Sequence, residues 1–89
     1  MTALGHLMIE DIVQRAVGQA LEEYRIEHPN ISDVLERINV DTDVIPRIRE
    51  TAEYKAAEEK YVQARIEIDF FNNLLEIAKT VLPMILAAI

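Results

Sequence analysis

The pattern of apolar and polar positions predicts an amphipathic helix in the first third of the chain and a short helix after it. Between residues 7 and 27 apolar side chains recur at helical spacing with charged or polar residues between them, which is typical of a helix with one buried face. Pro29 should end this helix, because proline restrains the residue before it and cannot donate to a continuing helix. A short helix is predicted over 32–39, with Ser32 as its cap.

The second half of the chain carries a longer apolar repeat. Eleven apolar positions follow one another at alternating spacings of three and four residues: Tyr54, Ala57, Tyr61, Ala64, Ile68, Phe71, Leu75, Ala78, Leu82, Ile85 and Ile89. A repeat of this kind is typical of a helix whose narrow seam is buried against another helix. Pro46 is tolerated in a first helical turn and Pro83 is the next helix breaker, so we expect one long helix over 45–82, about 55 Å in length.

These elements predict an all-α protein, a helical hairpin or three-helix domain spanning residues 1–89 as a single unit. A second apolar line, which includes Phe70, Leu74 and Ile77, joins the seam over residues 66–81. One neighbouring helix cannot cover both faces, so we expect the long helix to assemble with another subunit through the seam. The alternative is that the first helix fills the seam, giving a monomeric domain.

Charges beside the seam favour an antiparallel pair of long helices. In a parallel pair like charges would face each other, whereas an antiparallel pair centred near residues 62–63 places Glu58 opposite Arg65 and Lys60 opposite Glu67. The predicted outcome is a homo-oligomer, an antiparallel dimer or a larger assembly. Its interface residues are Tyr54, Tyr61, Ile68, Phe71 and Leu75, with Glu58, Arg65, Lys60 and Glu67 setting the direction.

The charge of the chain is negative and uneven. The net charge is -7, and residues 1–46 hold nine acids against three bases, a balance of -6. This half would repel a phosphate backbone, so we expect no nucleic-acid partner, and it would attract a basic protein surface.

Composition also bears on the compartment. The chain has no cysteine, hence no disulfide framework and no thiolate metal site. The first residues carry no basic leader, and the apolar run over residues 81–89 is shorter than the ~20 residues that a spanning helix needs. We therefore expect a cytoplasmic protein that does not bind a membrane.

Catalysis and metal binding lack the residues that they need. Asp41 and Asp43 resemble the first and third ligands of a calcium loop, but Pro46 stands where the loop needs glycine. Ser32 is the only serine and has no histidine and acid at a suggestive spacing. We expect no catalytic residue, no metal site, no cofactor and no enzymatic activity.

One pair of basic residues indicates an alternative function. Arg47 and Arg49 follow Pro46 at the predicted start of the long helix, where free backbone amides and the helix dipole favour an anion. They could hold a nucleotide or another phosphorylated small ligand. They could equally be solvated, or paired with neighbouring acids.

The segment over residues 53–75, which reads EYKAAEEKYVQARIEIDFFNNLL, resembles a pattern in short, uncharacterised helical proteins encoded by bacteriophages. The resemblance implies a phage accessory protein or a host-directed inhibitor, without a role for any particular residue. Together with the charge, the sequence favours a non-enzymatic, oligomeric interaction protein that binds a protein partner through an acidic surface.

Overall fold

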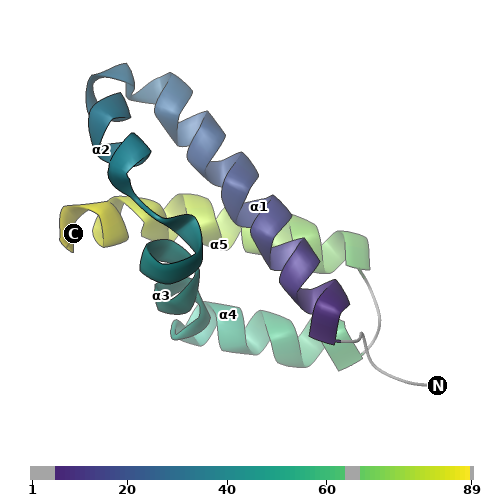
Figure 1. Ribbon diagram of the computed structural model, residues 1–89. Coiled ribbons are helices and arrows are strands. Elements are labelled where there is room, and N and C mark those ends of the chain that lie inside the picture. The colour runs from purple at the N-terminus through teal and green to yellow at the C-terminus, as the bar shows by residue number, and fades with distance from the viewer. Residues whose placement is uncertain (1–5, 64–66, 89) are drawn as a thin grey trace.

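The computed structural model describes residues 6–63 and 67–88, and these residues form an all-α fold with five α-helices and no strand. The all-α prediction is therefore confirmed. Three short helical turns lie between or after the α-helices (Figure 1). In chain order the elements are α1 (His6–Glu27), the 3₁₀ turn η1 (Pro29–Ile31), α2 (Ser32–Arg37), the π-type turn η2 (Val40–Val44), α3 (Ile45–Arg49), α4 (Ala52–Ala57), the π-type turn η3 (Glu58–Val62) and α5 (Glu67–Ala88).

Helix α1 covers the range predicted for the first helix. It buries one stripe, in which Val13, Ala16 and Val17 are fully inaccessible. Beyond its last turn the His28 amide still donates to the Tyr24 carbonyl oxygen at 2.9 Å, and the two rings lie 4.3 Å apart. Pro29 then opens η1, so proline ends α1 for the reason expected.

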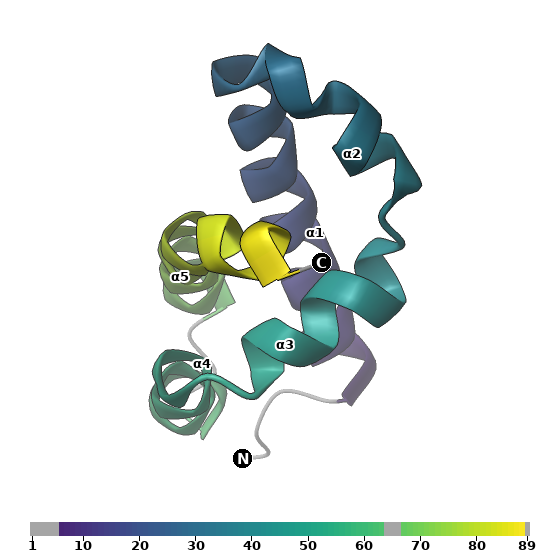
Figure 2. The same ribbon diagram turned by 90° about the vertical axis from the view of Figure 1, so that its left-hand side faces the viewer.

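Helix α2 is shorter than predicted and lies on the outside of the fold. It ends at Arg37, because Ile38 adopts an extended backbone, and none of its residues is buried. Ser32 is its first residue rather than its cap, and Ile31 takes the cap position without a side-chain hydrogen bond. Figure 2 shows α2 beyond the end of α1, on the way back toward α3.

The prediction of one continuous helix over 45–82 is wrong, and the first break is at Thr51. Helix α3 ends at Arg49, and Thr51 has an extended backbone with φ -71° and ψ 148°. Its hydroxyl accepts from the Tyr54 amide at 3.1 Å and donates to the Ile48 carbonyl oxygen at 2.7 Å. Threonine is a favoured N-cap because this hydroxyl satisfies an otherwise free amide, so Thr51 starts a new helix.

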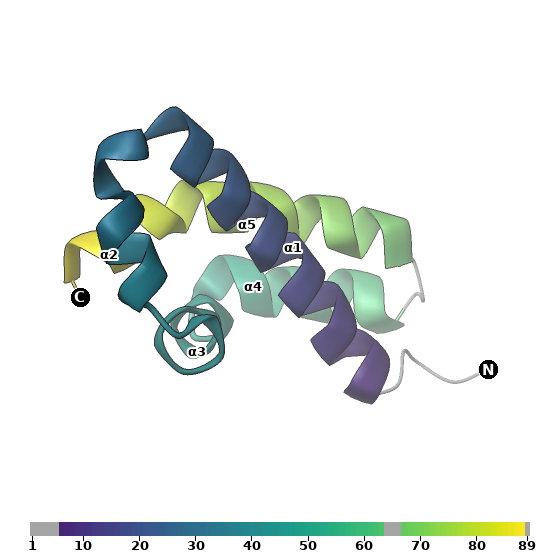
Figure 3. The ribbon, with the colours of Figure 1, turned by 45° about the horizontal axis from the view of Figure 1, so that its top comes forward.

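The second half of the expected rod folds back on the first. Helix α4 and η3 run antiparallel to α5 and beside it (Figures 1 and 3), and the Tyr54 and Phe70 rings lie 6.3 Å apart. The longest dimension of the molecule is 46 Å, less than the length expected for the rod. Residues 64–66, Arg65 among them, lie outside the described residues. Burial stabilises an apolar stripe on a helix, and here the two halves of the expected long helix bury much of each other's stripe.

The core lies where α1 crosses α5, with α3 and α4 packed below the crossing (Figure 1). All buried residues that the structure describes are apolar, and the largest fully buried side chains are Phe70, Ile48, Leu74, Leu82, Val13, Val17 and Val44. Helix α5 continues through the exposed Pro83 to Ala88, beyond the predicted end at 82. The fold therefore rests on four helices from both halves of the chain.

Candidate functional site

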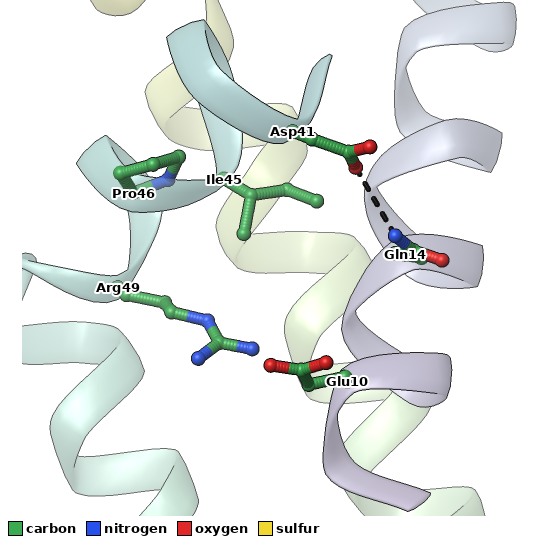
Figure 4. Close-up of a pocket in the computed structure, with 6 residues that line it drawn as sticks. All are labelled: Glu10, Gln14, Asp41, Ile45, Pro46 and Arg49. Atoms are coloured by element: carbon green, nitrogen blue, oxygen red, sulfur yellow. Dashed lines mark hydrogen bonds between the residues drawn. The ribbon is translucent and has the colours of Figure 1, made fainter. Parts of the chain in front are cut away.

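The hollow between α1, η2 and α3 is the first candidate site. It has a volume of about 340 Å³ and is lined by Glu10, Gln14, Asp41, Ile45, Pro46 and Arg49 (Figure 4). The Gln14 amide donates to an Asp41 carboxylate oxygen at 3.1 Å, and the Arg49 guanidinium points toward the Glu10 carboxylate. With two carboxylates and one guanidinium on its wall, the hollow has a negative balance and does not suit an anion.

The two candidate anion-binding arginines are not brought together. Arg49 lines the hollow described above, whereas the exposed Arg47 lines a different one, of about 360 Å³, beside Met84 and Ile85 of α5. Helix α3 has only five residues, and Pro46 stands in its first turn. A phosphate held by both guanidinium groups finds no support in this arrangement.

Tyr54 is the most perturbed titratable group that the structure describes. Its side chain is 3% exposed, and its hydroxyl has no hydrogen-bond partner at bonding distance among the described residues. Burial raises the pKa of the Tyr54 phenol well above its ordinary value, the neighbouring Glu58 carboxylate raises it further, and the Arg49 guanidinium partly opposes them. A phenol held neutral in this way cannot serve as a general base, so Tyr54 acts as a core side chain.

Asp41 and Asp43, which resemble calcium-loop ligands in the sequence, have hydrogen-bond partners of their own at η2. The Asp43 carboxylate accepts from the Asn39 amide at 3.0 Å, and the Asn39 side-chain oxygen accepts from the Asp41 amide at 3.0 Å. Within the described residues no three histidine, aspartate or glutamate side chains lie close enough to share a metal ion. Asn39 is therefore the N-cap of η2, the Asp43 carboxylate holds the Asn39 amide in return, and the Asp41 carboxylate is used by Gln14.

The predicted interface residues are divided between the core and the surface. Tyr54 is buried in the core, Tyr61, Phe71, Leu75 and Glu58 are half-buried, and Ile68, Lys60 and Glu67 are exposed. Ile68 is 75% exposed, the highest fraction among the large apolar side chains described. Much of the seam that the structure describes is thus buried or half-buried within the chain, and Ile68 is its one exposed member in that part.

A second hollow lies on the flank of the crossing between α1 and α5. It has a volume of about 580 Å³ and contains the exposed Ile68 and the half-buried Phe71 from α5, opposite Gly18 of α1. Arg15 and Glu67 are the two charged residues that line it. We call it the α1–α5 groove. Sequence reasoning found Ile68 and Phe71 through the heptad repeat, but it missed Gly18 and Arg15, which only the crossing of α1 over α5 brings to them.

Three exposed acids of the first half lie at the end of α1 and in α2, which also carries the exposed base Arg37. Glu27 at the end of α1 and Asp33 and Glu36 of α2 are exposed and have no ion-pair partner among the described residues. We call these three residues the acidic end (Figure 2, top). Neighbouring Glu22 differs, because Arg25 neutralises it in an ion pair.

Helix α5 is long and apolar enough to cross a membrane by length and composition, although 39% of its most apolar window is buried inside the fold. The core helix of a water-soluble domain can have the same length and composition, so this property is weak evidence for a membrane-spanning segment.

The fold and its surfaces define the class: a small all-α protein whose described residues offer an apolar groove and an acidic end. Comparisons with protein-family models, curated proteins and solved structures found no match.

Proposed function

We propose that this protein is a non-enzymatic interaction protein that self-associates and binds a basic protein partner through its acidic end. The observation that carries the proposal is that Glu27, at the end of α1, and Asp33 and Glu36, in the following α2, are exposed, and that these two elements adjoin at one end of the molecule (Figure 2). Such a cluster attracts a basic surface and speeds its association.

The self-association part of the proposal is supported by α5. Ile68 is 75% exposed, and Phe71 and Leu75, one and two turns further along the same face, remain half-buried. A single chain of this size gains stability from burying such a face against a partner. The resemblance to phage-encoded proteins would make the basic partner a host protein and the role that of an accessory factor or inhibitor.

Absence of catalysis is part of the proposal. Among the described residues Tyr54 is the titratable group with a strongly raised pKa, and it lies in the core. Binding of a phosphorylated ligand has less support, because Arg47 and Arg49 line separate hollows.

The test compares two variants with equal charge changes in capture experiments from the native host. One variant neutralises the acidic end (Glu27→Gln, Asp33→Asn and Glu36→Gln), and the control neutralises three exposed acids elsewhere (Glu50→Gln, Glu53→Gln and Glu59→Gln). The wild type and the control should retain the same basic protein, and the first variant should lose it. Equal retention by both variants would show that no particular surface is used.

A further inference from the structure

The described residues of the chain leave the α1–α5 groove unfilled. At Gly18 a Cβ atom would meet nothing within 4 Å, so no neighbouring group requires glycine there. Glycine inside a helix is unfavourable relative to alanine, and Gly18 lies in the middle of α1. No contact among the described residues therefore requires glycine at position 18, and its lack of a side chain leaves this wall of the groove open.

Opposite this open wall the groove carries an apolar projection. Ile68 is 75% exposed and stands one turn from Phe71, which is half-buried on the same side of α5. The groove thus combines the projecting side chain of Ile68 with the open space beside Gly18, which can accommodate a side chain of that kind. In a two-fold symmetric dimer the same patch meets itself, so that a projection on each copy fills the hollow on the other.

The charges of the groove fit a second copy of this chain. Arg15 of α1 and Glu67 of α5 are its two charged lining residues, and Arg15 also pairs with Asp11, one turn away on α1, at 3.1 Å. The molecule as a whole carries -7, so a groove that holds a guanidinium as well as a carboxylate opposes the approach of two copies less than the acidic surfaces do. A two-fold axis through the groove would also bring the exposed Arg15 of each copy toward Glu67 of the other, which places each guanidinium between Asp11 of its own helix and the carboxylate of the second copy.

From this geometry we infer that a second copy of the chain docks in the α1–α5 groove, with Ile68 of each copy inserted against Gly18 of the other and with Arg15 facing Glu67 across the interface. The inference rests on the self-association part of the proposed function and specifies its surface. Sequence reasoning placed the dimer seam along an extended rod; here the interface joins α5 to α1.

Three variants test the interface by sedimentation velocity at concentrations from about 1 to 100 µM. Ile68→Glu should raise the dissociation constant at least about a hundredfold, since two copies of an apolar contact are lost from each dimer. Gly18→Leu should also abolish the dimer by filling the hollow, while its thermal midpoint as a monomer stays equal or rises because leucine favours a helix. The matched control is Ile26→Glu on α1, where the native side chain is 71% exposed outside the groove, and it should keep the wild-type mass.

A charge exchange provides an independent test. The exchange is made in an Asp11→Asn background, because Asp11 pairs with Arg15 within α1. In that background Arg15→Glu and Glu67→Arg should each weaken the dimer a few-fold, and the double variant should recover the affinity because the pair is restored in reverse.

The outcomes separate the two levels of the proposal. A monomeric wild type up to 100 µM would overturn both self-association and the groove. A dimeric wild type whose mass survives both Ile68→Glu and Gly18→Leu would overturn the groove alone, and so would an equal effect of Ile26→Glu. Dimer loss in Gly18→Leu accompanied by a lower thermal midpoint would assign Gly18 to folding and overturn the docking role given to it here.

Discussion

Three polar atoms of half-buried or buried side chains lie out of solvent without a hydrogen-bond partner among the described residues: Glu23 Oε2, Arg49 Nε and Tyr54 Oη. For two of the three side chains, a group of opposite charge lies nearby. The other oxygen of Glu23 pairs with Lys79 of α5 at 3.3 Å, and the Arg49 guanidinium points toward Glu10 (Figure 4). The phenol of Tyr54 is neutral and more deeply buried, so its cost to stability is the easiest to measure.

Replacing Tyr54 with phenylalanine should leave the free energy of unfolding unchanged or raise it by about 1 kcal/mol at neutral pH, because the variant loses a hydroxyl that has no bonding partner among the described residues. Above pH ~10 the wild type should lose stability that the variant keeps. The raised pKa keeps Tyr54 protonated in the folded state while tyrosine ionises in the unfolded chain, so the unfolded state binds fewer protons.

The measurement is urea denaturation from pH 8 to 11 for both proteins. The difference between them should grow by up to about 1.4 kcal/mol per pH unit above pH ~10. Tyr24 and Tyr61 are present in both proteins, so their contributions cancel. Parallel pH profiles would show that Tyr54 ionises as freely in the folded state as in the unfolded one.

At the scale of elements, the informative arrangement is the antiparallel packing of α4 and η3 against α5. Tyr54, Ala57 and Val62 contribute buried side chains on one side of this hairpin, and Phe70 and Leu74 contribute them on the other. In a continuous helix residues 54 and 70 would be separated by about 24 Å along the axis, whereas their rings lie 6.3 Å apart.

This difference can be measured with a pair of spin labels. The chain has no native cysteine, so Glu53→Cys and Asp69→Cys place two labels at exposed positions without further changes. The hairpin should give a distance clearly shorter than the ~24 Å of a continuous helix. Diluting the labelled protein with an excess of unlabelled protein removes contributions between copies. A distance near 24 Å under these conditions would contradict the hairpin.

At the scale of the whole molecule, net charge opposes compactness. The chain carries -7 with 16 acids and nine bases, and like charges on a small folded protein repel one another. Salt screens this repulsion over a Debye length that falls from about 30 Å at 0.01 M to about 3 Å at 1 M. The same screening weakens attraction to a basic partner but not apolar contact between copies.

We therefore expect the thermal midpoint to rise by a few degrees between about 0.02 and 0.5 M sodium chloride, measured by circular dichroism at low protein concentration. The variant that neutralises the acidic end changes the net charge from -7 to -4, because three acids are removed, and it should show a smaller rise. An equal rise in both proteins would mean that repulsion at the acidic end does not limit stability.

The sequence by itself determined the local structure. Periodicity predicted an all-α chain and the extent of α1, and Pro29 marked its end, because helix formation and its interruption depend on residues within one or two turns. The same logic missed the break at Thr51, since threonine can sit inside a helix or cap one, and only the packing of α3 and α4 selects the cap.

Tertiary structure alone decided which surfaces meet. An apolar stripe specifies that a helix face needs burial but not what covers it, so the heptad repeat could not tell a partner chain from the second half of its own chain. Folding back places Tyr54 in the core and leaves Ile68 exposed, although both belong to one repeat. It also brings Gly18 to the groove with Ile68, since side chains distant in sequence meet only through the crossing of helices.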